Sequence, residues 1–129
     1  MNTDFSLTRV QADTIRQSLR HLVEEAHDNA TEHGFTKIYD EFMNAVPIEQ
    51  RRATRCTILL AKLALINSEV GEAVRALQHG DDPGFAEEIA DIVIRILDLC
   101  GYAHIDLGSE VINKMITNRK RPYLHGKEC

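Results

Sequence analysis

The chain has 129 residues, 43% of them hydrophobic and 27% charged, which is the composition of a soluble globular domain rather than of a disordered segment. Its 15 basic and 20 acidic residues give a formal net charge of −5, so no global basic field would draw it to nucleic acid or to an anionic membrane. The N-terminal sequence lacks the pattern of a signal peptide, and no apolar run reaches the roughly 18 residues of a membrane span. With three cysteines and no CxxC pair, we expect a cytoplasmic protein with reduced thiols.

The first half of the chain is predicted to form two long helices, because its apolar residues recur with the helical period. The first helix runs from about Leu7 to His33, and Gly34 provides a stop. The segment FTKIYDEFMNAV, which follows this glycine, is ambiguous. Pro47 suits the first turn of the second helix, which continues through Gln78 until the sequence HGDDPG breaks it.

The second half is predicted to form two further helices. The third spans about Phe85 to Gly101. The fourth begins near Asp106 or Ser109, both of which can cap a helix N-terminus, and it must end before Pro122.

No repeat, low-complexity tract or linker divides these four predicted helices. We therefore expect residues 1–129 to form one all-α domain, a four-helix bundle, with residues 122–129 as a C-terminal tail.

Four acidic residues lie near the turn between the second and third predicted helices. Glu69 and Glu72 precede the turn, and Glu88 and Asp91 follow it. The members of each pair are three residues apart and so lie within roughly 60° of each other around the helix. Because a short turn makes neighbouring helices antiparallel, the two pairs reach about the same height. The four carboxylates are therefore predicted to converge on one pocket.

The third predicted helix gives its acids little room for hydration. Its apolar residues cover roughly 220° of the circumference, well beyond the roughly 100° stripe of a surface helix. They are Ile89, Ile92, Val93, Ile94, Ile96, Leu97 and Leu99. Clustered carboxylates that lose hydration repel one another at a cost on the order of several kcal/mol unless protons or cations neutralise them.

A divalent cation is the simplest way to neutralise such a cluster. Oxygen-only ligands favour a hard ion, with Mg²⁺ first and Mn²⁺ second. The alternative is a set of ordinary salt bridges, in which Glu72 pairs with Arg75 or Asp91 pairs with Arg95. The spacing of the acids alone leaves both interpretations open.

Three segments in order, SEVGEAVRAL, EEIADIVIRILDLC and NKMITNRKRPYLHGKEC, resemble the MazG-like branch of the all-alpha nucleoside triphosphate pyrophosphohydrolases. ExxE followed by ExxD marks that superfamily, and AHDNATEHGF is similar to the segment that precedes this motif. The resemblance implies an oligomeric helical bundle that hydrolyses a nucleoside triphosphate to the monophosphate and pyrophosphate. It also implies that Glu69, Glu72, Glu88 and Asp91 hold Mg²⁺ and act in catalysis, a metal-bound water being the nucleophile.

This sequence departs from the family pattern at one position. Many members carry an acid directly before ExxE, where this chain has Ser68. Water activation by an acid at that position is therefore not available. The base would instead be one of the four acids or a metal-bound hydroxide.

Phosphate binding needs cationic or amide donors beside the metal. Lys114, Asn118 and Arg121 are spaced i, i+4 and i+7 and are predicted to lie on one face of the fourth helix. Lys62, two turns before Glu69, is a further candidate. The alternative for these residues is that basic groups near a helix C-terminus stabilise its dipole, and that Lys62 is a solvated or snorkelling lysine.

For the nucleobase, the resemblance indicates the end of the first helix. His27 and Phe35 would stack on or bond to the base, and Asn29 would distinguish base edges. The alternatives are a core position for Phe35 and surface positions for the other two. Tyr123 and His125 belong to the family-like tail, which would cover the active site or a neighbouring subunit.

The sequence as a whole predicts a Mg²⁺-dependent nucleoside triphosphate pyrophosphohydrolase that removes unwanted nucleotides from the pool and forms a homodimer or homotetramer. One alternative is a narrower dUTP or dCTP pyrophosphatase. Another is a catalytically weak nucleotide-binding or interaction bundle, which would have no need for convergent acids. Mg²⁺-dependent nucleotide binding distinguishes the last possibility from the other two.

Overall fold

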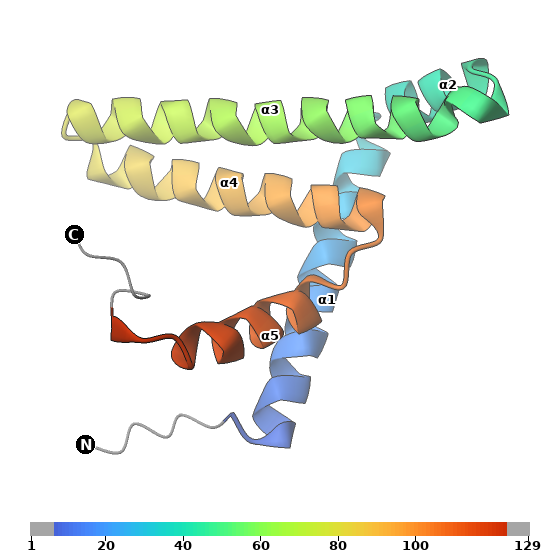
Figure 1. Cartoon of the computed structure of the whole chain (residues 1–129). Coiled ribbons are helices and arrows are strands. Elements are labelled where there is room, and N and C mark those ends of the chain that lie inside the picture. Colours follow the sequence, from blue (N-terminus) through green and yellow to red (C-terminus); the bar gives the residue numbers. More distant parts are fainter. Residues whose placement is uncertain (1–6, 124–129) are drawn as a thin grey trace. The chain divides into compact units, whose positions relative to one another are not determined.

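The structure is a computed structural model that describes residues 7–123. These residues form α1 (Arg9–Glu32), α2 (Lys37–Ala45), the 3-10 helix η1 (Ile48–Gln50), α3 (Arg51–Gln78), α4 (Asp82–Ala103) and α5 (Leu107–Arg119) (Figure 1). No strand occurs among the described residues, which confirms the all-α class. The prediction of four helices is wrong, because the ambiguous segment after Gly34 forms the additional helix α2. Within residues 7–123, no helix is long and apolar enough to cross a membrane.

The chain divides into two compact units, and α1 contributes to both. The hairpin unit consists of residues 23–105. The terminal unit contains residues 1–22 and 106–129, of which 7–22 and 106–123 are described. That residues 1–129 form one domain stays a prediction. The predicted tail, residues 122–129, lies for the most part outside the described residues.

In the hairpin unit, α1 and α3 end close to glycines with a left-handed backbone, and α4 begins at a capping aspartate. Gly34, with a φ of 83°, follows α1, and Gly80, with a φ of 68°, follows α3. Asp81 then caps α4, because its carboxylate accepts a hydrogen bond of 3.0 Å from the Gly84 N–H. Helix α4 therefore begins three residues earlier than predicted, with Pro83 in its first turn.

Helix α3 begins later than Pro47 suggests. This proline precedes η1, and the α-helix starts at Arg51. From there α3 and α4 run side by side as an antiparallel pair (Figure 1). Ile58, Ala73, Leu97 and Cys100 are buried in this unit. Burial raises the pKa of the Cys100 thiol, so the thiol stays neutral inside the core.

In the terminal unit, Asp106 is the cap of α5. Its carboxylate accepts hydrogen bonds from the Ser109 N–H at 3.3 Å and from the Ser109 hydroxyl at 2.9 Å. Ser109, the other predicted cap, lies in the first turn of the helix. Gly108 packs against the backbone of Arg16 in α1, where an added Cβ would lie 2.8 Å from Arg16 Cα. Ala12 and Ile112 are buried in this unit.

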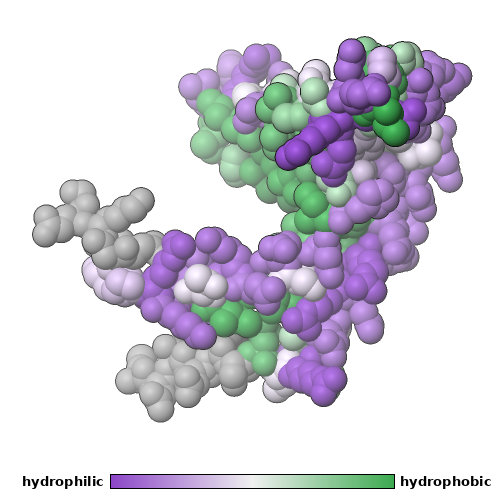
Figure 2. Space-filling view, turned by 45° about the vertical axis from the view of Figure 1, so that its right-hand side comes forward, coloured by the Kyte–Doolittle hydropathy of each residue, from purple (hydrophilic) through white to green (hydrophobic). Residues whose placement is uncertain are grey.

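Helix α3 also carries a stripe of exposed apolar side chains. The stripe residues follow one another at intervals of three or four residues, with a single polar member, Asn67. The apolar members are Leu60, Leu63, Val70, Val74 and Leu77, which are 41–61% exposed. Figure 2 shows apolar side chains gathered over the part of the molecule where α3 and α4 lie in Figure 1. A continuous apolar surface of this kind indicates a contact with another surface.

Candidate functional site

Three of the four predicted acids meet across the α3–α4 hairpin. Glu69 of α3 and Glu88 and Asp91 of α4 each place a carboxylate oxygen within 4.8 Å of the others. All three side chains are half-buried. The two helices bring them together because the turn between α3 and α4 is short, Glu69 and Asp91 lie at equal distances from it, and Glu88 lies one turn nearer on the same side of α4 as Asp91.

The electrostatics of this cluster are unfavourable for three full negative charges. Partial burial raises the pKa of Glu88 above its ordinary value, and the charges of Glu69 and Asp91 raise it further. A side-chain hydrogen bond to Glu69 acts in the same direction. Glu88 thus favours a proton or a cation beside it. An oxygen-only donor set with this repulsion fits a hard divalent cation.

Arg95 neutralises part of the cluster, so the metal and salt-bridge interpretations of the sequence are not exclusive. Arg95 Nε lies 2.5 Å from Glu69 Oε1. The predicted pair of Asp91 with Arg95 is wrong, because Arg95, one turn further along α4, reaches across to α3 instead. Glu72 lies outside the group of three and pairs with Arg75 at 3.5 Å, as the salt-bridge alternative predicted.

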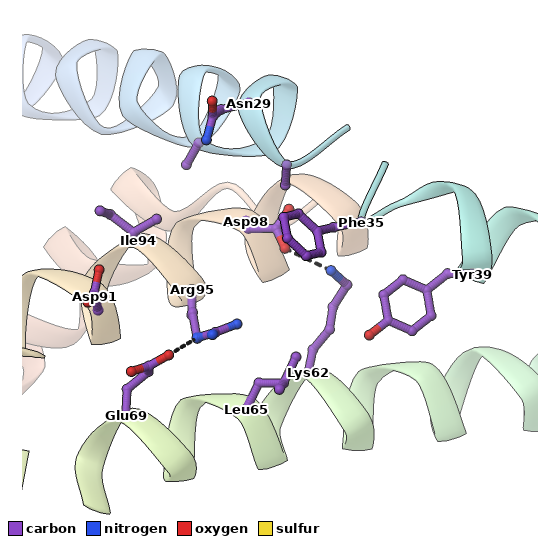
Figure 3. Close-up of a pocket in the computed structure, with 12 residues that line it drawn as sticks. Asn29, Phe35, Tyr39, Lys62, Leu65, Glu69, Asp91, Ile94, Arg95 and Asp98 are labelled. Atoms are coloured by element: carbon purple, nitrogen blue, oxygen red, sulfur yellow. Dashed lines mark hydrogen bonds and ion pairs between the residues drawn. The ribbon is translucent and has the colours of Figure 1, made fainter. Parts of the chain in front are cut away.

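A cavity of about 320 Å³ adjoins these acids. Its acid end holds Glu69 and Asp91, its other end holds the aromatic rings of Phe35 and Tyr39, and Asn29 of α1 lies between the two ends on the opposite side from Lys62 (Figure 3). Helices α1, α3 and α4 and the segment from Phe35 to Tyr39 form its walls. The volume suits a small organic ligand. Glu88 instead lines a neighbouring open pocket at the hairpin turn, together with Glu72.

Lys62 is buried in the cavity wall, with only 6% of its surface exposed. Its Nζ donates a hydrogen bond of 2.8 Å to Asp98 Oδ2. The same ammonium lies 4.9 Å and 5.0 Å from the ring centroids of Tyr39 and Tyr102. Since Lys62 has an anionic partner and two aromatic faces, its burial is compensated. The alternative of a solvated or snorkelling lysine is therefore wrong.

Of the residues predicted to bind the base, Asn29 and Phe35 line the cavity directly. Phe35 is 70% exposed, which excludes the alternative that it is a core residue of the described structure. His27 does not line the cavity. Its Nδ1 lies 3.0 Å from Asp98 Oδ1, and its ring packs against Gly101, where an added Cβ would come within 2.5 Å of His27 Cβ.

The predicted phosphate-binding residues belong to the terminal unit, whereas the acids belong to the hairpin unit. Lys114 and Asn118 are exposed on α5. The prediction that Arg121 shares their helical face is wrong, because α5 ends at Arg119 with Lys120 as its C-cap. Tyr123 is exposed, and His125 lies outside the described residues.

Asp98, Arg95 and Tyr39 were not assigned a role in the site from the sequence. A signal for Asp98 exists in the spacing. Lys62 precedes Glu69 by seven residues and Asp98 follows Asp91 by seven. In an antiparallel hairpin where Glu69 faces Asp91, Lys62 and Asp98 must therefore also face each other, two turns further from the hairpin turn. Tyr39 lies on α2, the helix that the sequence left ambiguous, and no spacing pointed to it.

Residues 59–122 match the MazG nucleotide pyrophosphohydrolase domain, which identifies this part of the chain as a MazG domain, in the MazG-like all-alpha NTP pyrophosphohydrolase superfamily. The match contains all four predicted acids, together with Lys62, Arg95 and Asp98.

Two curated proteins are similar to part of this chain, and both are named for one substrate. The chain is similar to dCTP pyrophosphatase 1 of Rattus norvegicus, with 35% identity over 73 residues that make up 54% of this chain and 43% of that protein. It is also similar to dCTP pyrophosphatase 1 of Mus musculus, with 36% identity over 83 residues, 52% of this chain and 48% of that protein. The chain thus covers less than half the length of these relatives. No solved structure gave a significant match.

Proposed function

We propose that the chain is a nucleoside triphosphate pyrophosphohydrolase that uses Mg²⁺, with Mn²⁺ as a substitute. It would convert an NTP or dNTP to the monophosphate and pyrophosphate and thereby clear unwanted nucleotides from the pool. One observation carries the proposal: the segment that matches a MazG domain brings Glu69, Glu88 and Asp91 together, and Glu69 and Asp91 also line one end of a cavity of about 320 Å³.

In this proposal the acids hold the cation, with Glu72 as a fourth ligand from the next turn of α3. A bound cation would lower the pKa of a coordinated water and offset charge on the phosphate oxygens. Phe35 offers an exposed ring on which a base can stack, and Asn29 offers an amide that can pair with its edge. His27 would act through Asp98. Lys114, Asn118 and Arg121 remain candidates for the outer phosphates.

The site of bond cleavage tests the activity. Hydrolysis in oxygen-18 water with Mg²⁺ should place the label in the nucleoside monophosphate and leave pyrophosphate unlabelled, because attack is at the α-phosphorus. Release of orthophosphate with a nucleoside diphosphate would mean attack at the γ-phosphorus. The pyrophosphohydrolase proposal would then be wrong even if the acids do bind metal.

A narrower specificity for dCTP or dUTP is the second candidate, and the names of the two curated relatives favour dCTP within it. A panel of ribo- and deoxynucleoside triphosphates, each assayed for pyrophosphate release, decides between broad and narrow specificity. If no nucleotide is hydrolysed but one binds in the presence of Mg²⁺, the chain is a nucleotide-binding bundle instead.

We further propose that two copies of the chain associate, through the apolar stripe of α3 that begins at Leu60 and ends at Leu77. Its three- and four-residue spacing is that of a helix seam that packs against another helix. Asn67, inside the stripe, would fix the register of the two copies by pairing only in one alignment. A dimer is the minimum assembly, and a tetramer would add a second interface. The complete bundle would be formed by the assembly.

A further inference from the structure

Arg95 occupies a position between the two ends of the cavity. It lies one turn after Asp91 on α4 and lines the cavity together with that residue and Glu69. Its bond to Glu69 uses Nε. Figure 3 shows the rest of the guanidinium directed away from Glu69, toward the cavity interior on the side of Lys62. The Nε edge of the guanidinium thus contacts Glu69, while its terminal nitrogens point into the cavity.

We infer that Arg95 links the metal-binding end of the site to the substrate: its Nε holds the Glu69 carboxylate in place, and its terminal nitrogens bind a phosphate oxygen of the nucleotide. This inference rests on the proposed function. It makes Arg95 a positioning residue toward the metal ligand and a binding residue toward the polyphosphate. An arginine can do both because its planar group presents donors in two directions at once.

The charges of the cavity support this assignment. A polyphosphate that enters the cavity meets the carboxylates of Glu69 and Asp91, so a cationic donor must lie beside them in addition to any metal ion. Among the described residues that line the cavity, the other basic one is Lys62. That ammonium is already committed to Asp98 and lies over two tyrosine rings. Of these two described lining residues, Arg95, with 40% of its side chain exposed, is the one available to a ligand.

The bond to Glu69 also reduces the entropy lost on binding. Because Nε is held at 2.5 Å from Oε1, the guanidinium is oriented before a phosphate arrives, and less rotamer freedom is lost when it binds. Glu69 is fixed by the same contact, with 15% of its side chain exposed. The structure therefore presents both groups in the geometry in which they would act.

The test is a binding measurement that does not depend on turnover. Inorganic tripolyphosphate in the presence of Mg²⁺ serves as the probe, because it contains no base, and isothermal titration gives its affinity for the full chain. We expect Arg95→Gln to weaken binding by roughly tenfold or more, the loss expected for charge-assisted hydrogen bonds. Arg52→Gln removes the same charge from an exposed position at the start of α3 and should leave the affinity unchanged. Equal affinity of wild type and Arg95→Gln would overturn the inference.

A conservative variant tests the geometry separately from the charge. Lysine carries one nitrogen, so Arg95→Lys should restore only part of the lost affinity. Full restoration would show that charge alone matters. The Arg95 Nε–H resonance in a nitrogen-15 spectrum, assigned by its loss in Arg95→Gln, should persist when Mg²⁺ and tripolyphosphate are added. Its disappearance into exchange with water would mean that Arg95 releases Glu69, and the linking role would be wrong.

These outcomes separate the inference from the proposed function. If the wild type releases pyrophosphate from a nucleotide and Arg95→Gln binds tripolyphosphate as well as the wild type does, only the role of Arg95 fails. If the wild type neither hydrolyses any nucleotide nor binds Mg²⁺ or tripolyphosphate, both fail together.

Discussion

Lys62 Nζ and Asp98 Oδ2 lie 2.8 Å apart and join α3 to α4 in the wall of the cavity. The second oxygen of the same carboxylate contacts His27 Nδ1 of α1 at 3.0 Å. One carboxylate therefore ties three helices of the hairpin unit at a single point. The ammonium is buried, whereas the acid keeps 19% of its side chain exposed. Removing the acid and removing the lysine should therefore change the free energy of unfolding by different amounts.

Asp98→Asn should destabilise the protein by about 3 kcal/mol, since it leaves a buried ammonium without a counter-charge. Adding Lys62→Met to that variant should recover part of the loss, because the buried charge is then removed and the methionine can pack against Tyr39 and Tyr102. Urea unfolding of the single and double variants measures both effects. A double variant less stable than Asp98→Asn would show that the two residues do not act as an ion pair.

The acid cluster predicts a stabilising response to metal ions. Mg²⁺ or Mn²⁺ should raise the melting temperature of the wild type in proportion to the logarithm of its concentration above the dissociation constant. Glu88→Gln and Asp91→Asn should weaken this response. In a metal-free buffer Glu88→Gln should be more stable than the wild type, because the repulsion from Glu69 and Asp91 is relieved.

Glu87→Gln provides the control for these variants. Glu87 precedes Glu88 on α4, is exposed and lies outside the group of three acids, so it removes the same charge without touching the cluster. Differential scanning fluorimetry across millimolar Mg²⁺ suffices for the comparison. An identical response in Glu87→Gln and Glu88→Gln would count against a metal site at the cluster.

The cap of α5 predicts a dependence of stability on pH. Hydrogen bonds from the Ser109 side chain and backbone lower the pKa of Asp106 below its ordinary value of 3.8. A carboxyl whose pKa is lower in the folded state stabilises that state above its unfolded pKa, and the contribution disappears as the pH falls through the folded value. Asp106→Asn keeps a capping oxygen without the charge. The difference in the free energy of unfolding between wild type and variant should therefore become smaller as the pH falls below about 3.8. A difference that stays constant from pH 7 to pH 3 would contradict this account.

The apolar stripe of α3 predicts an assembly that one charge can disrupt. Val74 is 49% exposed within the stripe, and Val74→Glu would bury a carboxylate against apolar side chains of the second copy. The variant should therefore be a monomer of 14.6 kDa where the wild type is at least a dimer. Light scattering measures the masses. Thr57→Glu, at an exposed α3 residue outside the stripe, should assemble normally, and a monomeric wild type would refute the proposed interface.

The sequence predicted most of the hairpin because strong local signals mark it. The period of the apolar residues extends without interruption along α3 and α4, and Gly80 with Asp81 ends one helix and starts the next. Three of the four acids converge as expected. Glu72 does not, because Arg75 on the same helix lies within reach and draws its side chain away. Side-chain pairing of this kind depends on rotamers, which spacing does not specify.

Other features depend on contacts between distant parts of the chain, and the sequence carried little sign of them. Helix α2 has only nine residues, too few to be stable alone, and it forms where it can pack against α3. That packing also brings the ring of Tyr39 next to Lys62 and Tyr102, and the centroids of the two tyrosine rings lie 6.1 Å apart. Helix α5 ends at Arg119, two residues short of Arg121, although the next proline is Pro122. The exact end of a helix is weakly encoded where no glycine or cap is present.

Gly101 determines how closely the end of α1 can approach α4. An added Cβ there would lie 2.5 Å from His27 Cβ, an atom fixed to the helix backbone, so α1 would have to move outward by the bulk of a methyl group. The stretch that would move contains Asn29, which lines the cavity, while Gly101 itself does not. The width of the cavity at Asn29 thus depends on Gly101, a residue that does not line it. Gly101→Ala offers a way to widen the cavity, and so to change which ligands enter, without replacing any residue that a ligand touches.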